Sequence, residues 1–301
     1  MLLVCGTAPL KELPLTEGEA GLDGDILRVG GAGIPCTQGT AALVSAACKT
    51  LDYLGQPAPR VLLVGDDGTG KGSRQLYERL IEDLPRLAPR VVVLHYMLPV
   101  MGLMRRVSES ASKAPRRPFM IADAAAMYAA KAAGIAREFD LFTPDLSELA
   151  FLADPQATHP AYVSRHLFES DSTRIPEMVA AAYANGSAAR TLVVKGATDH
   201  IAQEGRILDT LSEPDIPALE AIGGTGDTIS GMVGALVHAG YDEVTAARVA
   251  VRANRTAGLY AGATPATRIR QVIEALPRVF ADHLDGWVRQ AQIERAERSA
   301  P

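Results

Sequence analysis

Four short runs of consecutive apolar residues, rich in β-branched side chains, most constrain the fold of this chain. They lie at residues 60–64 (RVLLV), 90–94 (RVVVL), 119–122 (FMIA) and 191–194 (TLVV). Each run is unbroken rather than alternating with polar residues, which is typical of strands buried on both faces of a parallel sheet. We therefore predict a mostly parallel central sheet that is covered on both sides.

Helical patterns separate these runs. Residues 40–54 are rich in alanine with apolar residues at helical spacing, and residues 73–84 follow a glycine-rich turn. Residues 175–184 end before Asn185-Gly186, a pair that suits a helix C-terminus. Strands that alternate with helices predict right-handed crossovers and an α/β fold of three layers, helix–sheet–helix.

One domain accounts for the whole chain. No internal repeat or low-complexity linker divides the sequence, so we expect a single α/β domain over residues 1–301. From Thr264 onward the pattern is that of a surface helix, and its polar end at residues 295–301 predicts a frayed tail.

Composition excludes several classes of protein. The net charge is −5 and no long basic run is present, which argues against a general nucleic-acid binder. No apolar run approaches the ~18 residues needed to span a bilayer. The apolar start of the chain is too short for a signal sequence, so we expect a cytoplasmic protein that does not bind membranes.

The three cysteines, Cys5, Cys36 and Cys48, are odd in number. Their spacings match neither a disulfide framework nor a zinc site. We interpret them as small buried hydrophobic residues in a reducing compartment.

Two early glycine-rich turns are weak candidates for phosphate binding. Residues 30–33 (GGAG) lack the last glycine of a dinucleotide fingerprint, because position 36 is a cysteine, so we treat them mainly as a turn. The alternative is that this segment approaches a ligand, because Thr37, Gly39 and Thr40 begin the next helix. Residues 65–72 (GDDGTGKG) satisfy GxxxxGK, but Gly72 stands where a P-loop needs a serine or threonine, and two aspartates would repel phosphate. We interpret this second turn as a connection with an exposed lysine, and a true P-loop is the alternative.

A third turn, at residues 222–231 (IGGTGDTISG), is the stronger candidate because an apolar helix of small residues follows it. Its glycines let the backbone approach a ligand without a Cβ clash. The free N–H groups of the first helical turn then point at an anion, and the helix dipole adds a favourable field. We predict that Gly224, Thr225 and Gly226 bind a phosphate group.

Asp227 ends this turn and has two interpretations. A carboxylate beside a phosphate is electrostatically costly, so its presence needs a reason. Asp227 either caps the helix and favours its dipole, or acts as a general base that takes a proton from a substrate hydroxyl as that hydroxyl attacks phosphorus.

At these residues the chain resembles the ribokinase-like superfamily, whose members carry a G-[AST]-G-D turn at the head of a late helix. Within that superfamily it is most similar to ADP/ATP-dependent NAD(P)H-hydrate dehydratases. The similarity rests on residues 120–127 (MIADAAAM), 141–148 (LFTPDLSE) and 193–198 (VVKGAT), which precede the GTGD turn in the family's order. It covers residues 90–262 and implies a ribokinase-like fold.

The departures from the family pattern fall mainly on the substrate side. The family's Thr-Pro-His-Pro-Gly-Glu reads TPDLSE here, so that Asp145 stands in place of the histidine. Ala125 replaces the second aspartate of Asp-Ala-Asp-Ala, and Tyr128 replaces an asparagine that often follows. An early glycine-rich segment is replaced by residues 95–101 (HYMLPVM). Either the substrate differs or the chain is a paralogue that has lost activity.

The resemblance implies roles for further residues on the nucleotide side, each with an ordinary structural alternative. Lys195 contacts a phosphate or substrate, or is an exposed lysine at a strand end. Glu148 holds Mg²⁺, directly or through water, which we favour over a solvated position on a helix capped by Asp145 or Ser147. Asn254 lies where the family places the nucleotide base, although a helix-surface asparagine is the interpretation we prefer.

The substrate side carries three candidates. Asp123 either hydrogen-bonds the substrate or caps the helix of residues 124–133, and we favour the cap. His95 and Tyr96 line the substrate pocket or form a buried pair at a strand end.

Three functional hypotheses remain open. The first is an ADP/ATP- and Mg²⁺-dependent NAD(P)H-hydrate dehydratase, in which phosphorylation of the added hydroxyl and elimination of phosphate restore the ring double bond. The second is an ATP-dependent small-molecule kinase of the same fold, acting on a thiazole, a pyrimidine or a sugar. The third is a non-catalytic nucleotide-binding paralogue. The partners implied are a nucleotide and a small molecule, with homo-oligomerisation possible.

Overall fold

The computed structural model describes residues 1–157 and 172–299. The strands are β1 (Leu2–Ala8), β2 (Thr16–Asp23), β3 (Ile26–Val29), β4 (Ala32–Pro35), β5 (Arg60–Gly65), β6 (Val91–His95), β7 (Phe119–Asp123), β8 (Leu141–Phe142), β9 (Thr191–Val194), β10 (Asp199–Gln203) and β11 (Arg206–Leu211). The α-helices are α1 (Gly39–Tyr53), α2 (Lys71–Leu87), α3 (Met101–Ser112), α4 (Ala125–Ala132), α5 (Leu146–Ala153), α6 (Ile175–Ala184), α7 (Thr225–Ala239), α8 (Glu243–Tyr260) and α9 (Ile269–Ser299). Short 3₁₀ segments are η1 (Ala136–Glu138), η4 (Ser172–Arg174) and η5 (Pro217–Ala221).

The strands form one sheet of eleven strands in the order β11-β10-β9-β8-β7-β6-β1-β5-β2-β3-β4. Strands β9, β8, β7, β6, β1 and β5 run parallel to their neighbours in this series. Antiparallel strands extend both edges, with β10 and β11 beyond β9 and with β2, β3 and β4 beyond β5. The core of the sheet is therefore parallel, as the unbroken apolar runs predict.

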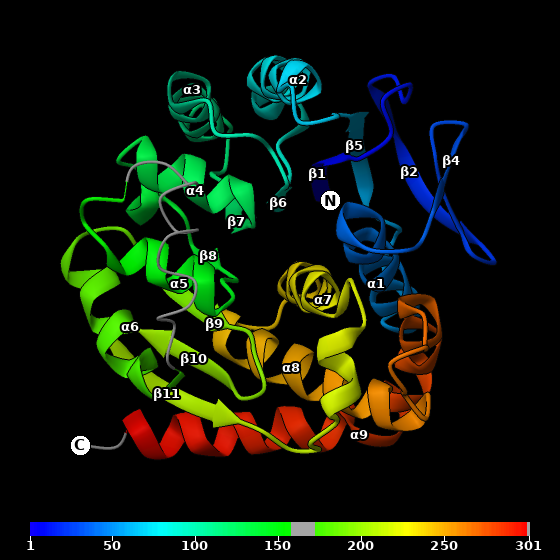
Figure 1. The fold of residues 1–301 in the computed structure, drawn as a ribbon, viewed down its shortest axis with the longest axis vertical. Coiled ribbons are helices and arrows are strands. Elements are labelled where there is room, and N and C mark those ends of the chain that lie inside the picture. The colour runs from blue at the N-terminus through cyan, green and yellow to red at the C-terminus, as the bar shows by residue number, and fades with distance from the viewer. Residues whose placement is uncertain (158–171, 300–301) are drawn as a thin grey trace.

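Helices cover both faces of the sheet (Figure 1): α2 to α6 lie on one face, and α1, α7, α8 and α9 lie on the other. The central strand β1 contributes side chains to the hydrophobic cores on both faces of the sheet. Leu2 and Val4 pack into the core beneath α1 and α7, whereas Leu3 and Cys5 pack into the core beneath α2 to α6. This alternation follows from the two-residue period of a strand, and it confirms the three-layer architecture.

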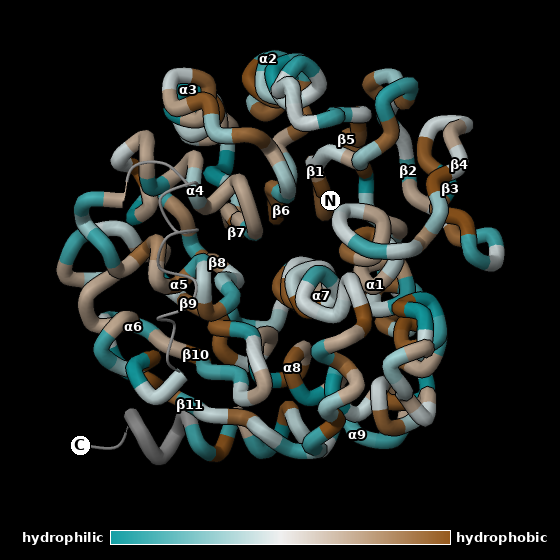
Figure 2. Tube along the Cα trace, viewed as in Figure 1, coloured by the Kyte–Doolittle hydropathy of each residue, from teal (hydrophilic) through white to brown (hydrophobic). Residues whose placement is uncertain are grey.

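Hydrophobic residues follow the strands, and hydrophilic residues gather on outer surfaces such as that of α2 (Figure 2). The last helix, α9, is amphipathic, since Ile269, Val272 and Ile273 are buried while Gln271 and Glu274 are exposed. The three cysteines are buried and free, which confirms their interpretation as small core residues. Within residues 1–157 and 172–299, no helix combines the length and apolarity needed to cross a bilayer.

Each of the four predicted strands is present, as β5, β6, β7 and β9, and the predicted helices correspond to α1, α2 and α6. Strands β1 and β8 of the parallel core and the antiparallel edge strands were not predicted. Among the edge strands, β2 contains glycine and charged residues and has only two fully buried positions, so it gives no apolar run. The described part of α9 continues to Ser299, through most of the segment for which a frayed tail is predicted.

Helices α1 and α7 approach each other closely, and this contact positions the site. A Cβ atom added to Gly231 in α7 would lie 2.1 Å from the carbonyl oxygen of Leu43 in α1. Only glycine permits so short a separation between two helix backbones. As a result the N-termini of α1 and α7 lie side by side, and the main-chain N–H of Gly39 reaches the carboxylate of Asp227.

Candidate active site

Polar side chains gather where the parallel strands end. His95 ends β6, Asp123 ends β7, and the two are register partners. Thr143 follows β8 and Lys195 follows β9. Because parallel strands present their carboxyl ends at one edge, these residues meet where ligands bind in open α/β sheets.

Strained backbone follows two of these strand ends. Tyr96 and Ala124 come directly after His95 and Asp123, and both have positive φ angles, 50° and 52°. A positive φ is uncommon for residues other than glycine, and such residues cluster at functional sites. Thr7 holds the Tyr96 backbone in place, because the carbonyl oxygen of Tyr96 accepts a hydrogen bond from the Thr7 hydroxyl at 2.7 Å.

The late glycine-rich turn forms the N-terminus of α7, as predicted. Gly224 is the N-cap with φ 97°, a left-handed conformation that favours glycine, and no side chain caps this helix. The N–H groups of residues 225–227 therefore lie in the first turn, where an α-helix supplies no internal acceptors. Such an end is suited to an anion.

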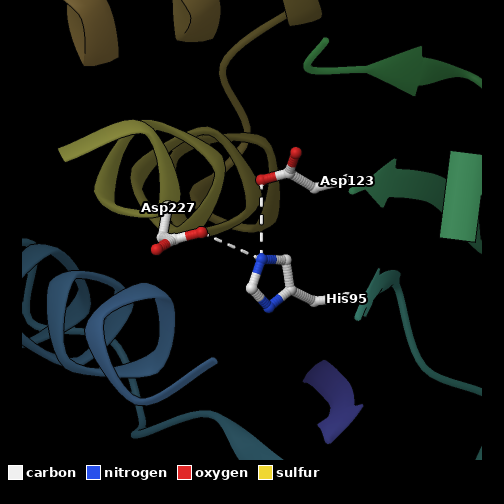
Figure 3. Close-up of side chains that lie close together, drawn as sticks. All are labelled: His95, Asp123 and Asp227. Atoms are coloured by element: carbon white, nitrogen blue, oxygen red, sulfur yellow. Dashed lines mark hydrogen bonds and ion pairs between the residues drawn. The ribbon is translucent and has the colours of Figure 1, made fainter. Parts of the chain in front are cut away.

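Asp227 does not cap its own helix. Its Oδ2 accepts a hydrogen bond from the main-chain N–H of Gly39 at 2.7 Å, and its Oδ1 lies 3.0 Å from Nε2 of His95 (Figure 3). The capping interpretation is thus wrong, because the carboxylate turns away from the α7 amides toward α1 and β6. The main-chain N–H groups at the start of α7 therefore have no side-chain cap, and the Asp227 carboxylate still lies next to them.

The surroundings of Asp227 favour its ionised form. Burial by itself would raise the pKa of this carboxyl, but the hydrogen bond and charge of His95, the charge of Lys195 and the Gly39 N–H together hold it below its ordinary value. The side chain is 13% exposed, so it can still meet a ligand.

Asp123 is the centre of a buried network rather than a helix cap. Its Oδ1 accepts hydrogen bonds from the ammonium of Lys195 at 2.9 Å and from the N–H of Ala124 at 2.8 Å. Its Oδ2 accepts one from the hydroxyl of Ser230 at 2.5 Å. Helix α4 has no side-chain cap, so the capping interpretation that the sequence favoured is wrong.

Lys195 is not an exposed strand-end lysine, since its side chain is only 12% exposed. Burial lowers its pKa, but the charges of Asp123, Glu148 and Asp227 outweigh that effect and hold the pKa well above its ordinary value. The ammonium therefore stays charged beside the α7 turn, where the side chain of Lys195 lies about 3.5 Å from the Cβ position of Gly226.

Two cavities meet at Asp227. The first, of about 410 Å³, lies on the side of the α7 turn and Lys195, and its lining includes Thr225, Gly226, Lys195, Asn254 and Glu148. The second, of about 540 Å³, lies on the side of α1, and its lining includes Gln38, Gly39, Thr40, Asp66 and Gly223. Asp227 and Tyr96 line both cavities.

Asn254 and Glu148 differ from the alternatives given for them. Asn254 is 5% exposed and accepts a hydrogen bond from the Thr228 hydroxyl at 2.7 Å, so it is no helix-surface residue. Glu148 closes a capping box with Asp145, accepting from the Asp145 N–H at 2.8 Å, and it borders the first cavity. Burial and the charge of Asp145 raise the pKa of Glu148 to about 8.

His95 and Tyr96, the two adjacent candidates on the substrate side, differ in burial and in their access to the cavities. His95 is fully buried behind Asp227 and lines neither cavity, whereas the neighbouring Tyr96 is 46% exposed and lines both. The predicted site residues Asp123, Lys195, Glu148, Asn254 and the 224–227 turn all lie at this one edge of the sheet.

The GxxxxGK turn is filled by its own aspartate. Oδ1 of Asp66 accepts from the N–H groups of Gly68 and Gly70, and Oδ2 accepts from the N–H and hydroxyl of Ser73. The carboxylate thus occupies the place that a phosphate takes in a P-loop. Gly72 packs with its Cβ position 2.1 Å from the carbonyl oxygen of Gly65, which leaves no room for the serine or threonine of that motif.

Sequence reasoning indicated that Gly39 and Thr40 could lie near a ligand, but it missed Ser230 and did not predict the bonds that Gly39, Thr40 and Ser230 make to Asp227, His95 and Asp123 respectively. The small polar residues after Gly39 and within residues 228–230 were the available signal. Their role depends on the close packing of α1 against α7, which no local pattern reveals.

Comparisons with known proteins agree with this geometry. The model of the NAD(P)H-hydrate dehydratase family matches residues 91–278. An uncharacterized protein of Methanocaldococcus jannaschii is 38% identical over 242 residues, which make up 80% of this chain and 100% of that protein.

Solved structures share the fold. A ribokinase-like superfamily protein of Enterococcus faecalis is similar with a TM-score of 0.55 and 14% identity, over 93% of this chain and 86% of that one. The ADP/ATP-dependent NAD(P)H-hydrate dehydratase of Bacillus subtilis, co-crystallized with ATP and Mg²⁺, is similar with a TM-score of 0.55 and 15% identity, over 93% of this chain and 91% of that one. The fold is therefore ribokinase-like, and the chain belongs to the NAD(P)H-hydrate dehydratase family.

Proposed function

We propose that this chain is a nucleotide-dependent NAD(P)H-hydrate dehydratase that works by a kinase-like step. The observation that carries the proposal is the placement of Asp227 between two cavities, one beside the open amides of α7 and one beside α1. A phosphoryl transfer needs a donor pocket and an acceptor pocket that share one base. The family match over residues 91–278 includes Asp227, Lys195 and the strand ends beside them.

The first cavity suits the nucleotide. The amides of Thr225 and Gly226, which line this cavity, together with that of the adjoining Gly224, would hold a phosphate, and the charged Lys195 would stabilise the negative charge that develops during transfer. Asn254 lines the same cavity and would contact the base or sugar. The Bacillus subtilis neighbour, an ADP/ATP-dependent enzyme, supports ADP or ATP as the donor.

In the proposed reaction Asp227 accepts the proton of the hydroxyl group that was added to the nicotinamide ring. The hydroxyl oxygen bonds to the terminal phosphorus of the nucleotide, and the bond from that phosphorus to its bridging oxygen breaks. Loss of the phosphate and of a ring proton then restores the double bond. Lowering of the Asp227 pKa keeps this base ionised near neutral pH.

A magnesium ion would fit the first cavity. Glu148 and Asp145 supply carboxylate oxygens at its wall, and oxygen ligands are those that Mg²⁺ prefers. When bound, the ion would neutralise phosphate charge. Glu148 would hold it through its oxygen that does not accept from the Asp145 N–H, directly or through water.

The test is to mix the protein with hydrated NADH, Mg²⁺ and ADP or ATP and to follow the absorbance of the restored dihydronicotinamide. Recovery supports the proposal. Nucleotide binding without turnover of any compound would instead identify a non-catalytic paralogue, for which Ala125 and Tyr128 are the relevant departures.

One observation favours a second candidate, a kinase for a small hydroxyl compound. Among the described residues that line the second cavity, Asp66 and Asp227 are carboxylates and none is lysine or arginine. A dinucleotide brings two or more phosphate charges, which such a lining does not balance, whereas an uncharged or cationic acceptor meets no such cost. Phosphorylation of a member of a panel of thiazoles, pyrimidines and sugars, without recovery of NADH, would support this candidate.

A further inference from the structure

The hydrogen bonds around the His95 ring determine where its protons lie. The hydroxyl of Thr40 has a single proton and lies 2.6 Å from the carbonyl oxygen of Thr7, which can only accept. The same hydroxyl oxygen lies 2.9 Å from Nδ1 of His95. Since its proton is committed to Thr7, Thr40 must accept at the second contact, and Nδ1 of His95 must carry a proton.

The other ring nitrogen faces carboxylates. Nε2 lies 3.0 Å from Oδ1 of Asp227 and 3.8 Å from Oδ2 of Asp123 (Figure 3). A bare nitrogen lone pair at 3.0 Å from an ionised carboxylate would be repelled, so a second proton lies between Nε2 and Oδ1.

The local charges favour placing this second proton on Nε2 of His95. Asp227 at the head of α7 and Asp123 at the end of β7 contribute two negative charges, and Lys195 after β9 contributes one positive charge. An uncompensated charge in a buried site is costly. A doubly protonated His95 balances these charges. The ring of Tyr96 packs edge-on against the imidazole, with the two ring centroids 4.3 Å apart.

We propose that His95 is a positioning residue for the base, holding Asp227 ionised and oriented through a protonated imidazole. The proposal rests on the proposed phosphoryl-transfer function of Asp227. The carboxylate is fixed at both oxygens, by Nε2 of His95 at Oδ1 and by the Gly39 N–H at Oδ2, and its remaining lone pairs are left to accept the substrate proton at the cavities that Asp227 lines. During transfer the substrate O–H bond breaks, its proton passes to Asp227, and His95 keeps both of its own protons.

The direct test is nitrogen-15 NMR of the His95 ring in the unmodified full-length chain, which requires no turnover. We expect both ring nitrogens to show the chemical shifts of protonated nitrogen at neutral pH. A neutral ring with one unprotonated nitrogen would overturn the proposal, whatever reaction the protein performs. Failure to find any substrate would count against the proposed function and leave the NMR result to decide this inference.

Two variants separate positioning from a structural role. His95→Gln can keep a donor toward Asp227 without a charge, and His95→Asn can keep a donor toward Thr40 while losing Asp227. We expect kcat to fall by roughly 10-fold in the first and 100-fold in the second. The KM for nucleotide should stay within about 2-fold, and the acid limb of the pH–rate profile should move to higher pH in both variants.

His238→Gln is the matched control, because His238 is also buried on the α7 side but lies at the opposite end of that helix. Its pH–rate profile should coincide with that of the unmodified protein. If both His95 variants kept the kcat of the unmodified protein and the acid limb of the pH–rate profile did not move, the proposal would be overturned.

Discussion

The turns at residues 65–72 and 223–227 are alike in sequence and opposite in use. Both begin a helix, contain several glycines and carry at least one aspartate, although the early turn follows strand β5 and the late turn follows the 3₁₀ segment η5. Asp66 folds back onto the amides of its own turn, whereas Asp227 turns away to Gly39 and His95. A glycine-rich helix start is therefore available to a phosphate only when its own side chains bond elsewhere.

The largest expected effect concerns the aspartate of the late turn. Asp227→Asn removes the proton acceptor while keeping the shape of the side chain, so turnover should fall by about 10²–10⁴-fold. Nucleotide binding should persist, because the amides of Gly224 to Gly226 are untouched. Steady-state kinetics and calorimetry measure the two properties, and a variant with normal turnover would remove Asp227 from its role as base.

The aspartate of the early turn should matter for stability instead. Asp66→Ala leaves the N–H groups of Gly68, Gly70 and Ser73 without their acceptor. We expect the free energy of unfolding to fall by about 2–3 kcal/mol, with nucleotide affinity unchanged. Asp67→Asn, at the exposed neighbouring position, is the control and should be nearly neutral. Weaker nucleotide binding in the Asp66 variant would show that the early turn also serves the ligand.

Completing the P-loop motif should damage the early turn rather than activate it. Gly72→Ser restores the consensus hydroxyl, but the new Cβ would lie 2.1 Å from the carbonyl oxygen of Gly65. We expect a loss of roughly 1–3 kcal/mol in chemical denaturation from overpacking. Gly102→Ser in α3, where a Cβ meets nothing within 4 Å, should be tolerated. A stable Gly72 variant with increased ATP affinity would contradict the comparison.

The smallest effect separates two carboxylates whose partners outweigh burial from Glu148, in which burial outweighs the N–H donor of Asp145. The pKa values of Asp66 and Asp227 are lowered, with N–H donors among the causes, whereas burial and Asp145 raise that of Glu148 to about 8 from 4.5. A raised pKa means that the stability from the neutral form is present below pH 4.5 and is lost as pH rises toward 8.

Glu148→Gln keeps an acceptor for the Asp145 N–H and cannot ionise. Its unfolding free energy relative to the unmodified protein should therefore increase between pH 5 and pH 8, by less than about 1 kcal/mol because solvent screens this half-buried group. Thermal melts across that range measure the difference. An unchanged difference would mean that Glu148 is ionised throughout.

Much of the parallel core could be predicted, because strands β5, β6, β7 and β9 are unbroken apolar runs. Strand β8 in that core could not, since it has two residues, and strand β1 was interpreted only as an apolar start of the chain. The antiparallel strand β2 could not be predicted either, since it mixes glycine, charged and apolar residues. The GTGD turn and Asp227 were found because their chemistry is local in sequence. The partners of Asp227 were not, because Gly39 and His95 are 188 and 132 residues away and meet it only through the packing of α1 and β6 against α7.

Contacts between residues far apart in the sequence also explain why the two capping interpretations were wrong. Asp123 and Asp227 each stand next to the start of a helix, where aspartate is a common cap. Their carboxylates bond instead to Lys195, Ser230, Gly39 and His95, groups supplied by other elements. A residue's distant neighbours, rather than its adjacent helix, decided the orientation of the side chain.

The most direct test is amide NMR during a titration with ATP and Mg²⁺. The N–H resonances of Thr225, Gly226 and Asp227 should shift with the bound fraction, while those of Gly68 and Gly70 stay in place because Asp66 already occupies them. Shifts at Gly68 and Gly70, or none at residues 225–227 with nucleotide bound, would contradict the assignment of phosphate binding to the late turn.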